Sequence, residues 1–113
     1  MNTIKNQVQL IGHLGKDPEV RKFESGKMRA AFSLATTDSY VNQNGEKVKD
    51  TQWHNVVVWG QTAKVVEKYL HKGSEVAIQG KLMYRNYEDK DGQKRYMTEI
   101  MANELMLMDK QQN

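Results

Sequence analysis

The sequence contains no cysteine and a single proline, Pro18, among its 113 residues. Without cysteine, neither a disulfide framework nor a thiolate metal site can form. No apolar run approaches the roughly 20 residues that a membrane-spanning helix needs. Residues 1–5 also lack the apolar segment of a secretory signal. These absences predict a cytoplasmic protein that needs neither disulfides nor a membrane.

Positive charge is in slight excess over negative charge. Seventeen lysines and arginines accompany fourteen acidic residues, which gives a formal net charge of +3 and a pI near 9.1. This excess favours an anionic partner only weakly, so the case for such a partner depends on where the cations lie in the fold. The chain length indicates one domain with a thin core, for which self-association is a natural supplement.

Apolar and polar residues alternate in several stretches, as they do in half-buried strands. Five strands are therefore expected, at residues 7–14, 28–37, 47–59, 75–87 and 94–108. Residues 61–70 have helical spacing instead, with Thr62 as a candidate N-cap and Gly73 as a candidate left-handed residue beyond the end. This order predicts an all-β fold with one helix: a five-stranded Greek-key OB-fold barrel with the helix between strands 3 and 4. A different small α+β meander would produce a similar string of elements.

Strand parity divides the third and fourth strands into two faces. The more apolar face carries Val56, Val58, Val76, Ile78, Leu82 and Tyr84. The opposite face carries Trp53, Asn55, Trp59, Lys81, Arg85 and Tyr87. If the five aliphatic residues of the first face fill the barrel, the opposite face displays aromatic rings and cations to solvent, which is costly without a partner. The alternative is that both indoles pack in the core or in a protein interface.

A surface that interleaves aromatic rings with cations suits single-stranded nucleic acid. Any base can stack on such a ring, and lysine and arginine attract phosphates regardless of sequence. Tyr40 precedes the first hairpin loop, where its ring could reach a strand, although it could equally cap the mouth of the barrel. This composition predicts sequence-tolerant binding that weakens as salt rises.

Signals for catalysis are poor. The histidines are dispersed without metal-ligand spacing, at His13, His54 and His71. A phosphate-loop interpretation of residues 12–16 fails because two residues separate the glycines where the motif needs four. The remaining enzyme hypothesis is either a metal-dependent nuclease that uses Asp89, Asp91 and Glu99 or a hydrolase. We expect no catalytic residue, no metal and no cofactor, since no set of titratable groups converges.

Five segments, in this order and at these spacings, form a specific pattern: GHLGKDPEVR (12–21), LATTDSY (34–40), WHNVVVWG (53–60), YLHKGS (69–74) and YRNY (84–87). In these segments the chain resembles the bacterial single-stranded DNA-binding proteins, and the resemblance covers roughly residues 6–108. It implies an OB-fold, usually assembled as a homotetramer, that protects single-stranded DNA during replication, recombination and repair. It also implies a cytoplasmic, nucleoid-associated location.

The resemblance further implies a set of DNA-binding residues. Four aromatic residues match base-stacking positions of the family: Tyr40, Trp53, Trp59 and Tyr87. Basic contacts are expected at Arg85, Arg21, Lys72, Arg95 and, from strand parity, Lys81. Asn55 occupies a contact position that is often basic in the family. His54 matches a histidine that the family associates with subunit assembly rather than with DNA.

We expect residues 1–108 to form the DNA-binding domain and residues 109–113 a short C-terminal remnant. Full-length members of the resembled family continue into a flexible linker and an acidic tail that recruits other proteins. Residues 109–113 have no such tip, so tail-dependent partners are not expected. The competing interpretation is a replication-restart accessory OB protein whose aromatic residues serve mainly as a protein interface.

Overall fold

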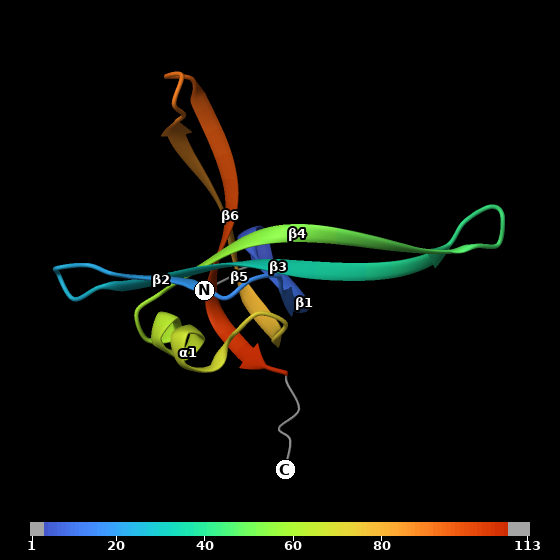
Figure 1. Ribbon diagram of the computed structural model, residues 1–113, viewed down its shortest axis with the longest axis horizontal. Coiled ribbons are helices and arrows are strands. Elements are labelled where there is room, and N and C mark those ends of the chain that lie inside the picture. Colours follow the sequence, from blue (N-terminus) through green and yellow to red (C-terminus); the bar gives the residue numbers. More distant parts are fainter. Residues whose placement is uncertain (1–3, 109–113) are drawn as a thin grey trace, which may run out of the picture.

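The computed structural model describes residues 4–108, so the expectation for residues 109–113 lies outside the described part of the chain. Figure 1 shows the arrangement of its elements. They are the short 3-10 helix η1 (Ile4–Asn6), β1 (Val8–Leu14), β2 (Glu19–Lys22), β3 (Met28–Val41), β4 (Lys47–Trp59), α1 (Gln61–Tyr69), β5 (Glu75–Glu88) and β6 (Lys94–Leu107). Among these residues no helix is long and apolar enough to cross a membrane.

The strands form one sheet in the order β1-β5-β6-β4-β3-β2, and a further pairing of β1 with β3 closes it. Five strands therefore make a closed barrel, with α1 between the third and fourth of them, and the predicted architecture is confirmed. The sixth strand, β2, pairs only with β3 and was not predicted. Its sequence, Glu19–Lys22, contains one apolar residue, Val20, so it offers no alternation to detect.

Alternate residues of the barrel strands point inward and form the core. The buried strand residues of this core are Leu14, Met28, Ala30, Phe32, Leu34, Val56, Val58, Val76, Ile78, Ile100 and Ala102. Helix α1 adds Ala63 and Val66, together with Leu70 just beyond its end. The predicted cap at Thr62 is wrong, because the helix begins at Gln61 with Gly60 as N-cap and no side-chain cap bond.

Two glycines allow the barrel to close, because they sit where strands approach too closely for a side chain. A Cβ placed on Gly12 would lie 2.2 Å from the carbonyl oxygen of Ala35 on β3. A Cβ on Gly80, at the irregularity between β5 and β6, would lie 2.1 Å from the carbonyl oxygen of Met101. Both obstacles are backbone atoms, which cannot move aside as a side chain can.

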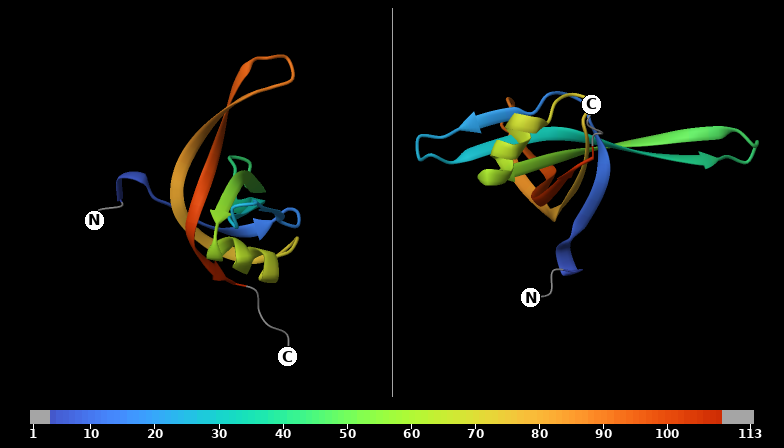
Figure 2. Two further views of the ribbon diagram at one scale, coloured as in Figure 1. Left: turned by 90° about the vertical axis from the view of Figure 1, so that its left-hand side faces the viewer. Right: turned by 90° about the horizontal axis from the view of Figure 1, so that it is seen from below.

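Two long hairpins extend beyond the barrel and diverge from it (Figures 1 and 2). One consists of the distal parts of β3 and β4, the other of the distal parts of β5 and β6; we call them the β3–β4 arm and the β5–β6 arm. The predicted interior placement of Leu82 is wrong, since its side chain is 38% exposed, and Tyr84, on the same face of β5, is 71% exposed. Beyond Gly80 the apolar face of β5 leaves the core and continues along the β5–β6 arm.

Candidate nucleic-acid interface

Trp53 lies on the outer face of the barrel, at the root of the β3–β4 arm. Its side chain is 62% exposed, and its register partner on β3 is Ala35. The indole lies against Gly15, since a Cβ there would be 2.5 Å from its Cζ3 and 2.8 Å from its Cη2. One side of the ring is therefore supported by backbone while much of the ring stays open to solvent. Sequence reasoning predicted the outward ring but not the role of Gly15.

Trp59 also faces outward, but a second ring covers part of it. Phe23 stacks on the indole with ring centroids 5.9 Å apart and planes inclined by 20°. The guanidinium of Arg21 lies 4.9 Å from the centroid of Phe23. Trp59 is consequently 39% exposed. The Trp59 ring, the Phe23 ring and the Arg21 guanidinium form a stack in this order. Sequence reasoning missed Phe23, because this residue lies outside the strands, just before the turn at Gly26.

The β5–β6 arm presents its predicted residues on one face. Lys81, Arg85 and Tyr87 alternate along β5, and the register partner of Tyr87 on β6 is Arg95. The Arg95 Nε donates a hydrogen bond of 2.8 Å to Asp89 Oδ2. This bond, followed by the one that the Gln93 backbone N–H donates, lowers the pKa of Asp89. The charge of Arg95 is therefore already paired before any ligand arrives.

A groove of about 270 Å³ lies between the roots of the two arms, and Asn55, Arg29, Arg85 and Glu99 are among its lining residues. An adjoining groove of about 220 Å³ shares the last three of these and adds Trp59 and Tyr84. The predicted residues Arg85 and Trp59 thus meet around one depression, together with Arg29, which was not predicted as a site residue. Three acidic residues, Asp17, Glu19 and Glu99, also line the first groove. Glu99 was considered in the sequence only as a nuclease carboxylate; its ion pairs with two arginines were not predicted, because these partners come from distant strands.

A third groove, of about 360 Å³, lies on the other side of Asn55 and is lined by Trp53 and Tyr96 among others. It lies where β4 and β6 separate, since these parallel strands share only the pairs Val56–Ile100 and Val57–Met101. Tyr96 is strongly exposed and was missed in the sequence. It follows charged residues in a strand with weak alternation, so nothing distinguished it from a solvated side chain.

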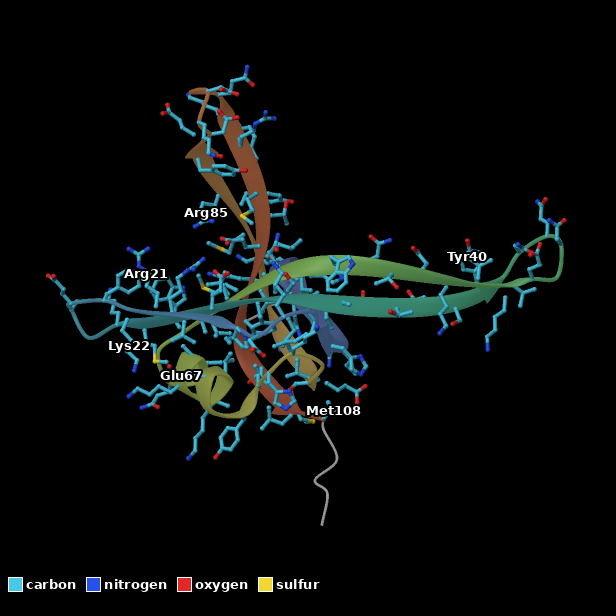
Figure 3. All side chains as sticks on the ribbon, in the orientation of Figure 1. Arg21, Lys22, Tyr40, Glu67, Arg85 and Met108 are labelled. Carbon is cyan, nitrogen blue, oxygen red and sulfur yellow. The ribbon has the colours of Figure 1, made fainter. Side chains whose placement is uncertain are left out.

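Tyr40 and Lys72 lie apart from these three grooves, whereas His54 lines the third one beside Trp53. Tyr40 pairs with Val48 and so points to the opposite side of the β3–β4 arm from Trp53, well out along the arm (Figure 3). Lys72 lies in the turn after α1, where its backbone N–H donates to Asp17 Oδ1 at 2.7 Å. His54 is half-buried, with its Nε2 2.9 Å from the Thr36 hydroxyl.

The carboxylates of the nuclease hypothesis do not converge. Asp89 is paired with Arg95 in the loop of the β5–β6 arm. Glu99 lies at the root of that arm, 3.6 Å from each of two guanidiniums. Within residues 4–108 no group of three or more histidine or acidic side chains is placed to hold a metal ion.

The contact between Gly15 and Trp53 gives a first prediction. Gly15→Ala should leave the barrel folded, because the crowded atoms belong to the far end of a side chain that can shift. The displaced ring should change the tryptophan emission and weaken oligo-dT binding, by less than the roughly 1–3 kcal/mol of a lost stack. Fluorescence titration measures both effects. In a Trp53→Ala background the same change should have no further effect, and additive losses would contradict the contact.

Comparison with known proteins gives a consistent result. A model of the Single-strand binding protein family matches residues 5–108. The chain is similar to Single-stranded DNA-binding protein 1 of Xylella fastidiosa, with 44% identity over 109 residues, 96% of this chain and 80% of that protein. It is similar to the Single-stranded DNA-binding protein of Bacteroides thetaiotaomicron, with 43% identity over 91% of this chain and 65% of that protein.

Among solved structures, the fold is similar to that of a Plasmodium falciparum SSB in complex with ssDNA. The TM-score is 0.83 and the identity 34%, over 92% of this chain and 95% of that chain. The predicted OB-fold is thereby confirmed.

Proposed function

Because this chain belongs to the single-strand binding protein family, we propose that it holds single-stranded DNA by stacking bases on outward rings beside phosphate-binding cations. The observation that supports this proposal most directly is the placement of Trp53. Its exposed indole lies on the barrel exterior and lines the 360 Å³ groove together with Asn55. Asn55 also lines the 270 Å³ groove, which contains Arg29 and Arg85. Members of the family are binding proteins, so no bond is made or broken.

The proposed mechanism divides binding between two kinds of contact. Each base that stacks on a ring contributes roughly 1–3 kcal/mol whatever its identity, because every base has a π-face. Each phosphate that meets a lysine or arginine releases counterions, which is also independent of sequence. Duplex DNA should bind poorly, because its bases are already stacked and paired.

The proposed contact residues lie on three hairpins, except for Lys72, which lies in the turn after α1. Figure 3 places Arg21 on the β2–β3 hairpin, Tyr40 on the β3–β4 arm and Arg85 on the β5–β6 arm. A ligand that touches all three must be long and flexible, as an unpaired strand is. In this proposal the four stacking residues are Tyr40, Trp53, Trp59 and Tyr87. The proposed cations are Arg85, Lys81, Arg21, Lys72 and Arg95, with Asn55 as a neutral polar contact.

We also propose that the chain acts as a homotetramer in the cytoplasm, serving replication, recombination and repair through a binding domain of residues 1–108. A row of apolar side chains supports self-association. Ile11 on β1, Ala77 on β5 and Met106 on β6 are linked by register on the outer face of the barrel. Ile11 and Met106 are mostly exposed, as side chains of an uncovered interface would be. His54, half-buried beside Thr36, is the proposed assembly histidine.

The proposed function is tested by titrating tryptophan fluorescence with oligo-dT at two salt concentrations, on protein of measured solution mass. We expect quenching by the oligonucleotide and little response to duplex DNA of the same length. The logarithm of the binding constant should fall with the logarithm of salt, by about 0.7 for each phosphate neutralised. Emission that ignores oligo-dT at low salt would refute the stacking proposal.

A further inference from the structure

A carboxylate lies between two arginines that line the grooves of the interface. One Glu99 oxygen, Oε2, is 3.6 Å from an Nη2 atom of Arg29 and 3.6 Å from that of Arg85. The Glu99 side chain is only 13% exposed, whereas that of Arg85 is 53% exposed. The guanidinium of Arg85, a proposed phosphate contact, and that of Arg29 therefore share one negative charge, and these three groups together carry a net charge of +1 rather than +2.

The strand register explains why these three groups meet. Glu99 pairs with Met83 on the outer face of the β5–β6 arm, one step along from the pair of Arg85 with Met97. Arg29 comes from β3, where its partner is Trp59. Glu99 and the two arginines line both the 270 Å³ and the 220 Å³ groove. A strand that follows the grooves from Trp59 toward Asn55 must pass this carboxylate.

The geometry of the cluster leaves Arg85 able to change partners. Hydrogen bonds between charged nitrogen and oxygen are normally about 2.7–2.9 Å long, so 3.6 Å is an ion pair without a close hydrogen bond. The other contact of the Arg85 guanidinium is with the Met97 sulfur at 3.5 Å, which is a weak acceptor. A phosphate could offer Arg85 a shorter and more strongly charged contact than either group.

We propose that Glu99 limits the affinity of the interface: its carboxylate competes with DNA phosphates for Arg85 and Arg29 and repels phosphates near them. This inference rests on the proposed function. It identifies an acidic residue inside the interface as a determinant of how tightly, and with what salt dependence, the strand is held. Without this charge, at least one more phosphate would be neutralised by the protein.

The test is Glu99→Gln, which keeps the shape of the side chain and removes its charge. We expect several-fold tighter oligo-dT binding and a salt slope steeper by about 0.7, the value for one additional phosphate on a single strand. The matched control is Glu67→Gln, the same charge change on exposed α1, away from Arg85 (Figure 3). The control should move affinity and slope much less. The gain should be smaller when Glu99→Gln is made in an Arg85→Ala background, where only Arg29 is left to be released.

The outcomes separate this inference from the proposed function. If the wild-type protein fails to bind oligo-dT, the proposed function fails. If it binds but folded Glu99→Gln binds equally or more weakly with an unchanged slope, only the inference is overturned. If Glu99→Gln does not fold, nitrogen NMR of the arginine side chains in the wild-type protein tests whether Arg85 changes partners when DNA binds. The Arg85 Nε signal should shift on adding oligo-dT, and an unchanged signal at saturation would overturn the inference.

Discussion

Replacing Trp53 with alanine is expected to weaken oligo-dT binding by roughly 5- to 150-fold, the equivalent of the 1–3 kcal/mol that one stacked base contributes. The effect should be large because the indole is both open to solvent and supported from behind by Gly15. The loss should persist at high salt, since stacking releases no counterions. Fluorescence anisotropy of labelled oligo-dT measures it, because the tryptophan signal itself is altered by the change.

The matched control for Trp53→Ala is Tyr69→Ala. Tyr69 is also an exposed ring, but it lies at the end of α1 beside Lys68 and lines none of the three grooves described above. Its loss should leave affinity nearly unchanged. If Trp53→Ala instead preserved affinity and altered the solution mass, the aromatic face would serve protein contacts, as in the competing interpretation of an accessory protein.

Gly12→Ala is expected to lower the free energy of unfolding by about 2–3 kcal/mol, near the upper end for overpacked sites. The reason is the 2.2 Å that would separate the new Cβ from the Ala35 carbonyl oxygen, at the point where β1 closes the barrel on β3. Relief requires the two strands to separate. For a domain of this size the melting temperature should fall by about 10 °C, measured by circular dichroism or calorimetry.

The control for Gly12→Ala is a glycine with a positive φ and no crowding around its Cα. Gly45 has a φ of 78° in the hairpin loop, and a Cβ added there would meet no atom beyond its chain neighbours within 4 Å. Asparagine tolerates this left-handed conformation, so Gly45→Asn should cost less than about 1 kcal/mol. Equal losses at both positions would mean that backbone conformation, rather than crowding at the closure, determines the cost at Gly12.

The barrel was predictable because its strands alternate clearly. Residues 47–59 were expected as a strand and form β4 with the same bounds, since Val56 and Val58 are buried while Trp53 and Trp59 are not. The pattern could not show where a strand leaves the core. Tyr84 continues the apolar face of β5 in sequence, but it lies on an arm with no core beneath it.

The site was predictable only in part, because sequence patterns report local periodicity and not contacts between distant strands. The exposure of Trp53 and the shared face of Arg85 and Tyr87 follow from strand parity. The support from Gly15 and the carboxylate of Glu99 do not, since each depends on how β1, β3, β4 and β6 come together. The DNA-binding roles assigned to individual residues remain predictions.

The narrow junction between β4 and β6 affects how the two arms relate to each other. Only two residue pairs join these strands, so side chains at the fork, rather than a continuous ladder of backbone bonds, fix the angle between the arms. A change in that angle would therefore break no backbone pair within either hairpin, whereas the pairs that hold each arm together run along its whole length.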